Sequence, residues 1–280
     1  MSETRTVLDA RTSPTRIINI KGTNFAYREF GPSTGVPVVF LHHFTAVLDD
    51  WDPRVIDGIA TERRVITFDN RGVGGSGGRT PTTVAAMADD AIAFIRALGL
   101  EQVDLMGFSL GGFVAQVIVT KEPQLVRRMV LAGTGPAGDI GKVSARLLGD
   151  FLHGILTSTD PKRYLFFTRT SNGKAAALAY LDRLTERTEG RVKKTSALGV
   201  AAQIVAIRRW AAQDPMELET IEHLVLVANG EDDRMVTTRS SFELAHRLRN
   251  ASLRIYPDAG HGGVFQYHER YVPEVLAFLS

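Results

Sequence analysis

A serine between two glycines stands in the pentapeptide Gly-Phe-Ser-Leu-Gly at 107–111. An apolar run (103–106) precedes this motif, and a second one (113–119) follows it. That order predicts a strand, a sharp turn and a helix, with the Ser109 hydroxyl raised above the end of the strand. Side chains at positions 107 and 111 would collide with neighbouring backbone, so glycine is required there. A serine held in this way can attack a carbonyl carbon, whereas the simpler interpretation is a serine cap at the start of a helix.

Two partners for such a serine follow it along the chain. The apolar run 224–229 ends at Gly230, and three acids (231–233) come next, where open α/β sheets place their sites. His261 follows the last predicted strand (253–256) in a glycine-rich loop. A hydroxyl, a carboxylate and an imidazole together perform acyl transfer. The chain order serine, acid, histidine is that of the α/β-hydrolases and differs from those of chymotrypsin and subtilisin.

These groups need a scaffold, and the apolar pattern predicts one of alternating strands and helices. One predicted helix (82–98) has a single apolar face and ends at Gly99. The predicted strands are 16–20, 24–30, 36–41, 65–68, 103–106, 129–132, 224–229 and 253–256. Such alternation predicts an α/β fold with a doubly wound, mostly parallel sheet.

The pattern changes over residues 135–215, where no strand is predicted and the helical segments are 143–156, 161–168, 174–187 and 192–210. We expect this segment to form a helical cap, or lid, over Ser109. Residues 1–134 and 216–280 then form the core domain. Phe151, Phe166 and Trp210 give the cap apolar surface. They either pack the cap on the core or line an apolar pocket that sets acyl specificity.

From about Asn24 to its end, the chain resembles the α/β-hydrolase fold family. The resemblance rests on the serine motif, on the loops that carry the acids and His261, and on residues 68–77, which are similar to that family's D-x-R-G-x-G-x-S loop. It implies a mostly parallel, eight-stranded sheet flanked by helices, with a helical cap. Among the family's branches, a serine resembles the esterases, lactonases and cofactor-free haloperoxidases. Dehalogenases and epoxide hydrolases carry aspartate instead.

The resemblance also implies residue roles. It selects Asp233, three residues after the glycine, as the acid that orients His261. It assigns the backbone N–H groups of Phe44 and Leu110 to the oxyanion hole. The family usually has glycine where this chain has His43, which leaves the local backbone geometry open and makes His43 a candidate for the pocket wall.

Other classes of function receive little support. A net charge of +2 on 280 residues indicates neither a nucleic-acid nor a membrane surface. The chain has no cysteine and no metal-ligand spacing, and neighbouring His42 and His43 would point to opposite faces of a strand. Glycines 72, 74 and 77 match a dinucleotide fingerprint, but residues 69–71 separate them from the strand. We expect no metal and no cofactor, a cytoplasmic protein and a small-molecule substrate; homo-oligomerisation stays open.

The function that these observations predict is a cofactor-free serine hydrolase acting on a small to medium carboxylic ester or lactone. Ser109, Asp233 and His261 would form the triad. Carbon–carbon bond hydrolysis and perhydrolysis of the haloperoxidase type stay open on the same triad. The alternative from another class is a hydrolase-like small-molecule receptor with little turnover, against which the complete set of three groups argues.

Overall fold

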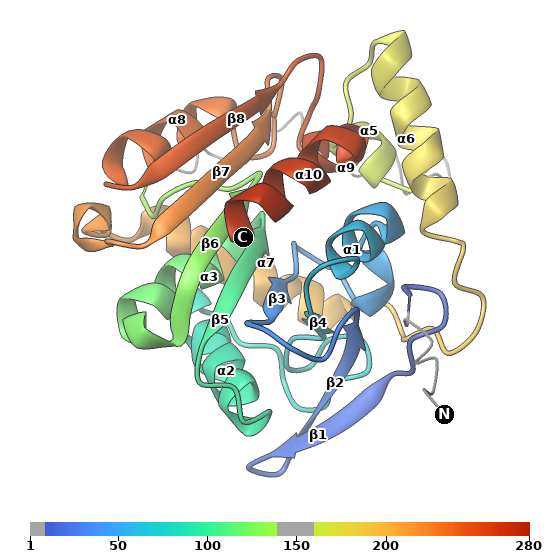
Figure 1. The fold of residues 1–280 in the computed structure, drawn as a ribbon, viewed down its shortest axis with the longest axis vertical. Coiled ribbons are helices and arrows are strands. Elements are labelled where there is room, and N and C mark those ends of the chain that lie inside the picture. Colours follow the sequence, from blue (N-terminus) through green and yellow to red (C-terminus); the bar gives the residue numbers. More distant parts are fainter. Residues whose placement is uncertain (1–8, 139–159) are drawn as a thin grey trace.

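The computed structural model of the chain describes residues 9–138 and 160–280. Within them, eight strands form one sheet in the order β1-β2-β4-β3-β5-β6-β7-β8 (Figure 1). The first two strands pair antiparallel with each other, β2 pairs antiparallel with β4, and all other pairs are parallel. The strands are β1 (Arg16–Ile20), β2 (Thr23–Phe30), β3 (Val38–Leu41), β4 (Val65–Phe68), β5 (Val103–Phe108), β6 (Val126–Ala132), β7 (Leu224–Gly230) and β8 (Ala251–Tyr256). This arrangement confirms the predicted fold class.

Helices connect the strands and cover the sheet. They are α1 (Pro53–Ala60), α2 (Val84–Ala97), α3 (Leu110–Lys121), α5 (Lys162–Leu165), α6 (Ser171–Arg183), α7 (Ala197–Ala212), α8 (Thr238–Arg247), α9 (Gly263–Gln266) and α10 (His268–Leu279), with single 3-10 turns at η1 (Leu48–Asp50), η2 (Pro123–Leu125) and η3 (Leu218–Thr220). None of the helices in the described ranges is long and apolar enough to cross a bilayer.

The sheet separates two apolar clusters, because neighbouring residues of a strand face opposite sides. In β3, Val39 and Leu41 belong to one cluster, whereas Val38 and Phe40 belong to the other. The first cluster takes side chains from α2, α3, α7 and α8, and the second takes them from α1, α6, α9 and α10. All residues of β3, β4 and β5 are buried, as expected for parallel strands covered on both faces.

The described residues between β6 and β7 contain α5, α6 and α7 and no strand. Their bounds follow three of the four predicted helical segments, while the segment 143–156 lies outside the described residues. Although they come from one connection, α6 and α7 pack into different clusters: Tyr180 of α6 lies in the second and Trp210 of α7 in the first. The connection therefore reaches both sides of the sheet.

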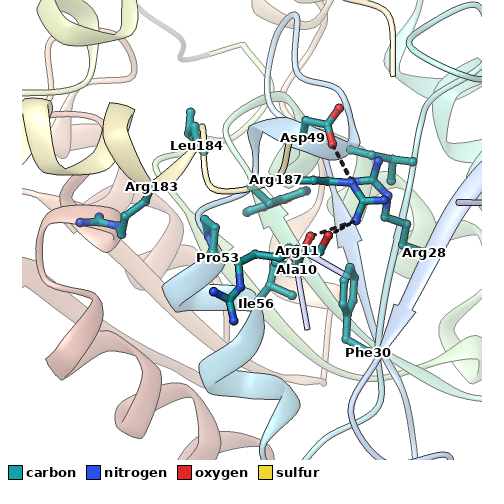
Figure 2. Close-up of a pocket in the computed structure, with 12 residues that line it drawn as sticks. Ala10, Arg11, Arg28, Phe30, Asp49, Pro53, Ile56, Arg183, Leu184 and Arg187 are labelled. Atoms are coloured by element: carbon teal, nitrogen blue, oxygen red, sulfur yellow. Dashed lines mark hydrogen bonds and ion pairs between the residues drawn. The ribbon is translucent and has the colours of Figure 1, made fainter. Parts of the chain in front are cut away.

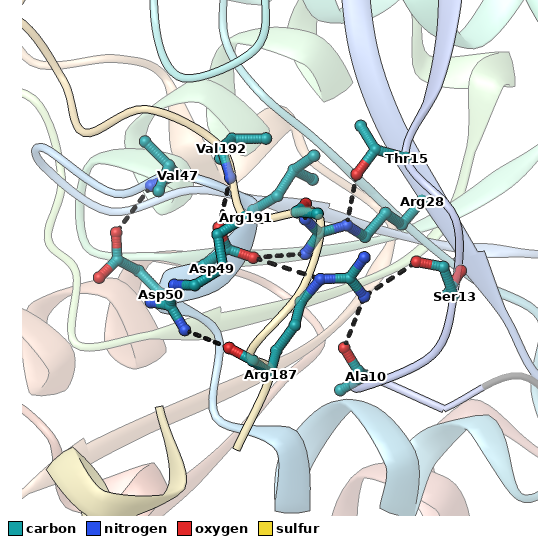
Figure 3. Close-up of polar contacts among 12 residues, drawn as sticks. Ala10, Ser13, Thr15, Arg28, Val47, Asp49, Asp50, Arg187, Arg191 and Val192 are labelled. Carbon is teal, nitrogen blue, oxygen red and sulfur yellow. Dashed lines mark hydrogen bonds and ion pairs between the residues drawn. The ribbon is translucent and has the colours of Figure 1, made fainter. Parts of the chain in front are cut away.

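A row of ion pairs joins this connection to the residues around η1. The pairs are Asp49–Arg187 (3.8 Å), Asp50–Lys162 (3.0 Å), Asp52–Arg183 (2.6 Å) and Arg54–Glu186 (2.7 Å). Figure 3 shows Asp49 between Arg28 and Arg187, and its carboxylate lies 2.7 Å from the Arg28 guanidinium. These three residues also line one side of a cavity of about 20 Å³ (Figure 2), which has room for about one water molecule.

Candidate active site

The predicted sharp turn lies between β5 and α3, and Ser109 is its central residue. Ser109 has φ +55° and ψ −116°, a backbone conformation that non-glycine residues seldom adopt. A Cβ atom at Gly111 would lie 1.9 Å from the carbonyl oxygen of Leu41, and one at Gly107 would lie 2.5 Å from that of Gly111. The prediction that both positions require glycine is confirmed by these close approaches.

Backbone contacts hold Ser109 in this conformation. Its N–H donates to the carbonyl of Ala132 at the end of β6 (2.9 Å), and its carbonyl accepts from the Thr134 hydroxyl (2.9 Å) and from the Gly112 N–H (2.9 Å). A Cβ at Gly112 would lie 2.5 Å from the Thr134 side chain. The serine turn is thus hydrogen-bonded both to the end of β6 with the residues after it and to the start of α3.

The acid and the base come from the loops after β7 and β8. The Nδ1 atom of His261 lies 2.7 Å from one carboxylate oxygen of Asp233, and both side chains are buried. The other carboxylate oxygen accepts from the N–H groups of Met235 (2.8 Å) and Val236 (3.1 Å). A carboxylate acceptor requires the proton on Nδ1, which leaves a lone pair on Nε2. The expected contact is therefore present for Asp233, while Asp232 and Glu231 are exposed.

Ring contacts place His261 beside the serine turn. Its imidazole centre lies 4.9 Å from the ring of Phe108, the residue directly before Ser109. A Cβ atom at Gly133, after β6, would lie 3.2 Å from Nδ1 of His261. The strands β5, β7 and β8 run parallel and end at one edge of the sheet, where the segments that follow them carry Ser109, Asp233 and His261.

The loop after β3 carries His43 and Phe44. The His43 ring packs edge-on against Phe108 (5.4 Å) and Phe166 (5.3 Å), and its Nδ1 lies 2.9 Å from the Phe44 carbonyl oxygen. Burial lowers the pKa of His43 to about 3, so the ring is neutral. The one residue of this loop with positive φ is Thr45 (φ +65°). The backbone at His43 therefore accommodates a side chain where the family usually has glycine.

The backbone N–H groups of Phe44 and Leu110 are the two that the sequence predicts for the oxyanion hole. In the part of the chain that the structure describes, neither the Phe44 N–H nor the Leu110 N–H donates to a protein acceptor. Leu110 is the first residue of α3, so its N–H also lies at the positive end of a helix dipole. Both groups are free to bind a developing negative charge.

The predicted pocket residues occupy different places. The Phe166 ring lies 5.3 Å from His261, and its carbonyl accepts from the Gly262 N–H (2.7 Å). Trp210 instead stacks on Phe113 of α3 (5.3 Å), in the apolar cluster on the other side of the sheet. Phe151 lies outside the described residues. Phe166 therefore lies against His261 and His43 lies against Phe166, and composition alone does not separate these two residues from Trp210.

The glycine loop after β4 surrounds a buried carboxylate. Asp69 accepts from the N–H groups of Gly75 (2.7 Å) and Leu48 (2.8 Å), and a Cβ at Gly74 would lie 2.2 Å from its oxygen. Burial raises the Asp69 pKa to about 7. This loop therefore uses its glycines to bind its own aspartate, not a phosphate. No cluster of metal-ligating side chains occurs among residues 9–138 and 160–280.

Comparison with known proteins agrees with this geometry. A family model described as alpha/beta hydrolase fold matches residues 36–266. A non-heme chloroperoxidase of Streptomyces lividans is 29% identical and covers 92% of this chain and 97% of its own length. A 2-hydroxymuconate semialdehyde hydrolase of Pseudomonas sp. (strain CF600) is 27% identical over 88% of this chain and 87% of its own.

Among solved structures, an alpha/beta hydrolase fold protein from Chitinophaga pinensis superposes with a TM-score of 0.89 at 39% identity. The superposition covers 98% of this chain and 99% of that one. The family match extends from β3 through the loop that carries His261, so it includes all three candidate groups. The chain belongs to the alpha/beta hydrolase fold family and is an enzyme of that family.

Proposed function

We propose that this enzyme is a cofactor-free serine hydrolase that cleaves a small to medium carboxylic ester or lactone through an acyl-enzyme. The observation that carries the proposal is the 2.7 Å contact between His261 and Asp233 beside the turn that presents Ser109. A neutral imidazole with its proton fixed on Nδ1 has Nε2 available as a general base. The serine on the strained turn is the group positioned to use it.

The reaction follows from these positions. The Ser109 hydroxyl attacks the substrate carbonyl and its proton passes to Nε2 of His261, while Asp233 stabilises the imidazolium. The N–H groups of Phe44 and Leu110 bind the oxyanion, each worth about 3 kcal/mol of transition-state stabilisation. His261 then gives the proton to the leaving alkoxide. It next takes a proton from water, which attacks the acyl-enzyme and releases the acid and free Ser109.

We further propose that residues 135–215 are a cap over the site and that residues 1–134 and 216–280 are the core domain. Phe166 supports this, since it brings an apolar ring against both His261 and His43. A dry, apolar wall strengthens the contacts to the oxyanion and favours apolar over charged acyl groups. It discriminates weakly, by about 1–3 kcal/mol for each methylene-sized change, so we expect broad ester specificity.

Perhydrolysis is the second candidate, because a relative that covers 92% of the chain is named a non-heme chloroperoxidase. In that reaction hydrogen peroxide replaces water: its oxygen attacks the acyl-enzyme and a peracid leaves. Carbon–carbon hydrolysis has the support of one relative's name, a semialdehyde hydrolase. Both reactions need the same serine, histidine and acid, so the substrate, not the triad, distinguishes them.

The test is hydrolysis of p-nitrophenyl esters of graded acyl length and of a lactone series, with and without hydrogen peroxide. Wild type should cleave several members, and Ser109→Ala should lose at least about 10⁴-fold in kcat while keeping the wild-type circular dichroism spectrum. Asp233→Asn should lose about 10³- to 10⁴-fold, because the tautomer is no longer fixed. A folded Ser109→Ala enzyme with full activity would exclude this mechanism.

A further inference from the structure

The loop after β3 (residues 42–47) carries the Phe44 N–H that we propose for the oxyanion hole, and we call it the oxyanion loop; it contains a strained residue next to Phe44. Thr45 has φ +65°, a left-handed conformation that a β-branched residue rarely adopts. Such a conformation costs of order 1–3 kcal/mol and persists only where surrounding contacts determine it. Sequence reasoning gave no signal for it, since nothing near Thr45 in the chain supplies those contacts.

Two side chains from the connection between β6 and β7 hold Thr45. The Oε1 atom of Gln203 accepts from the Thr45 N–H at 2.7 Å, and the Thr195 hydroxyl donates to the Thr45 carbonyl at 2.7 Å. Gln203 lies on α7, is completely buried and is 158 positions away from Thr45 in the chain. Both backbone polar groups of Thr45 are therefore satisfied by residues of this one distant segment.

These contacts fix the peptide unit that joins Phe44 to Thr45. Its N–H is held by Gln203, and its carbonyl oxygen lies 2.9 Å from Nδ1 of the His43 ring. Because a peptide unit is planar, holding it at both polar atoms fixes the backbone torsions on either side of it. The torsion on the Phe44 side sets where the loop, and with it the Phe44 N–H, lies relative to Ser109.

The backbone N–H groups that follow Thr45 donate to acceptors outside α7 and the residues just before it. The Ala46 N–H donates to the His43 carbonyl (3.1 Å) and the Leu48 N–H to Asp69 (2.8 Å). The Val47 N–H donates to Asp50 (3.0 Å), as Figure 3 shows. Only the Thr45 position relies on α7 and the residues just before it.

We propose that Gln203, assisted by Thr195, is a positioning residue for the oxyanion hole, so that the connection between β6 and β7 takes part in transition-state stabilisation and does more than cover the site. This proposal rests on the proposed serine-hydrolase function. In the described part of the chain, Gln203 makes no hydrogen bond to Ser109 or His261; it acts through the 44–45 peptide unit. Without its acceptor, the Thr45 N–H would be left buried and unpaired, and the loop would relax away from φ +65°.

The competing explanation is that Gln203 only docks α7 onto the core. Arg209 provides the matched control, because it lies on the same helix and donates to the Thr82 hydroxyl (2.8 Å) and carbonyl (3.1 Å), away from the oxyanion loop. Replacing it weakens the attachment of α7 without changing Thr45. The two positions thus separate docking from positioning.

The first experiment compares Gln203→Leu, Gln203→Glu, Thr195→Val and Arg209→Met on p-nitrophenyl butyrate. We expect Gln203→Leu to lower kcat about 10- to 100-fold with KM changed less than about threefold, and to weaken binding of phenylboronic acid by a similar factor. Thr195→Val should show a smaller loss of the same kind. Gln203→Glu keeps an acceptor but adds a carboxyl group at a buried position, so its kcat should lie between those of Gln203→Leu and wild type, while Arg209→Met should keep wild-type kcat. Wild-type kcat in Gln203→Leu, or an equal loss in Arg209→Met, would overturn the proposal.

The second experiment needs no turnover: amide hydrogen exchange of the peptide that contains Thr45. Exchange at Thr45 should speed up at least about tenfold in Gln203→Leu and stay at the wild-type rate in Arg209→Met. An unchanged rate in Gln203→Leu would refute the positioning role whatever the activity. If wild type cleaves no ester yet exchange responds as expected, the proposed function fails while the link between Gln203 and the loop stands. Should Gln203→Leu not fold, the same two readouts on Thr195→Val decide.

Discussion

The serine turn and the oxyanion loop lie side by side in the site but are built in opposite ways. The turn around Ser109 depends on absent side chains, since backbone atoms of Leu41 and Gly111 occupy the space that Cβ atoms at positions 111 and 107 would need. The oxyanion loop has no glycine from His42 to Val47, and its strained residue, Thr45, is held by side chains from far along the chain.

This difference predicts how substitutions will affect the serine turn and the oxyanion loop. A turn fixed by backbone contact fails when any atom is added, and its failure is one of folding. A loop fixed by hydrogen bonds from distant side chains can lose them and still fold, so its failure appears first in kcat. The same distinction decides which of the two could be predicted from sequence.

Gly111→Ala should produce the largest loss of stability. A stable Gly111→Ala variant would show that the serine turn is not fixed by backbone contact. The added Cβ lies 1.9 Å from the Leu41 carbonyl oxygen, and neither backbone can move without disturbing β3 or α3. We expect a loss of at least about 4 kcal/mol in the free energy of unfolding, or no soluble protein. Gly77→Ala is the control, because its Cβ would meet nothing closer than 3.8 Å. Urea unfolding measures both variants.

Arg28→Met tests how much the buried ion pair between Arg28 and Asp49 stabilises the fold. Arg28 and Asp49 are both buried and 2.7 Å apart, so removing the guanidinium leaves Asp49 with the more distant Arg187 as its cationic partner. We expect a loss of about 3 kcal/mol in the free energy of unfolding. The double variant Arg28→Met/Asp49→Leu should recover part of that loss, since the buried Asp49 charge is removed while Arg187 keeps its hydrogen bonds to the carbonyls of Ala10 and Ser13. Equal stability of Arg28→Met and wild type would show that the pair does not support the fold.

Phe166→Ala and Trp210→Ala compare an aromatic residue beside His261 with one on the other side of the sheet. Phe166 contacts His261 and His43, so its truncation should shift the preferred acyl length of p-nitrophenyl esters, by about 1–2 kcal/mol in relative kcat/KM. Trp210 stacks on Phe113 and should lower stability without shifting the profile. Matching profiles for Phe166→Ala and wild type would make Phe166 a packing residue only.

An effect of similar size concerns pH and the burial of His43. Burial lowers its pKa to about 3, whereas the unfolded chain protonates this histidine near pH 6.5. Acidification from pH 7 to 5 therefore adds a proton at His43 to the unfolded state alone and reduces stability, by about 2 kcal/mol. His43→Gln removes this contribution, so its stability deficit relative to wild type should shrink at pH 5. Urea unfolding at both pH values gives the comparison, and a constant deficit would contradict the buried, neutral ring.

The serine turn was predictable because its determinants are local. Glycines two residues before and after Ser109, between two apolar runs, specify the turn without knowledge of the rest of the fold. The loops of Asp233 and His261 were predictable for a related reason: each follows a predicted strand, and parallel strands end at the same edge.

The support of the oxyanion loop was not predictable in this way. Gln203 and Thr195 contact Thr45 across about 150 residues of chain, and no spacing in the sequence encodes that contact. Phe166 and Trp210 show the same limit. Both are aromatic residues in predicted helical segments, yet one lies against His261 and the other against α3.

The identity of the nucleophile is tested most directly by intact-protein and peptide mass spectrometry after treatment with a fluorophosphonate. Wild type should gain one adduct, on the peptide that contains Ser109, and the adduct should be absent from Ser109→Ala. Asp233→Asn should react slowly at the same site, because His261 loses its fixed tautomer. An adduct on another residue, or an unlabelled wild type that still cleaves esters, would contradict a serine hydrolase built on Ser109.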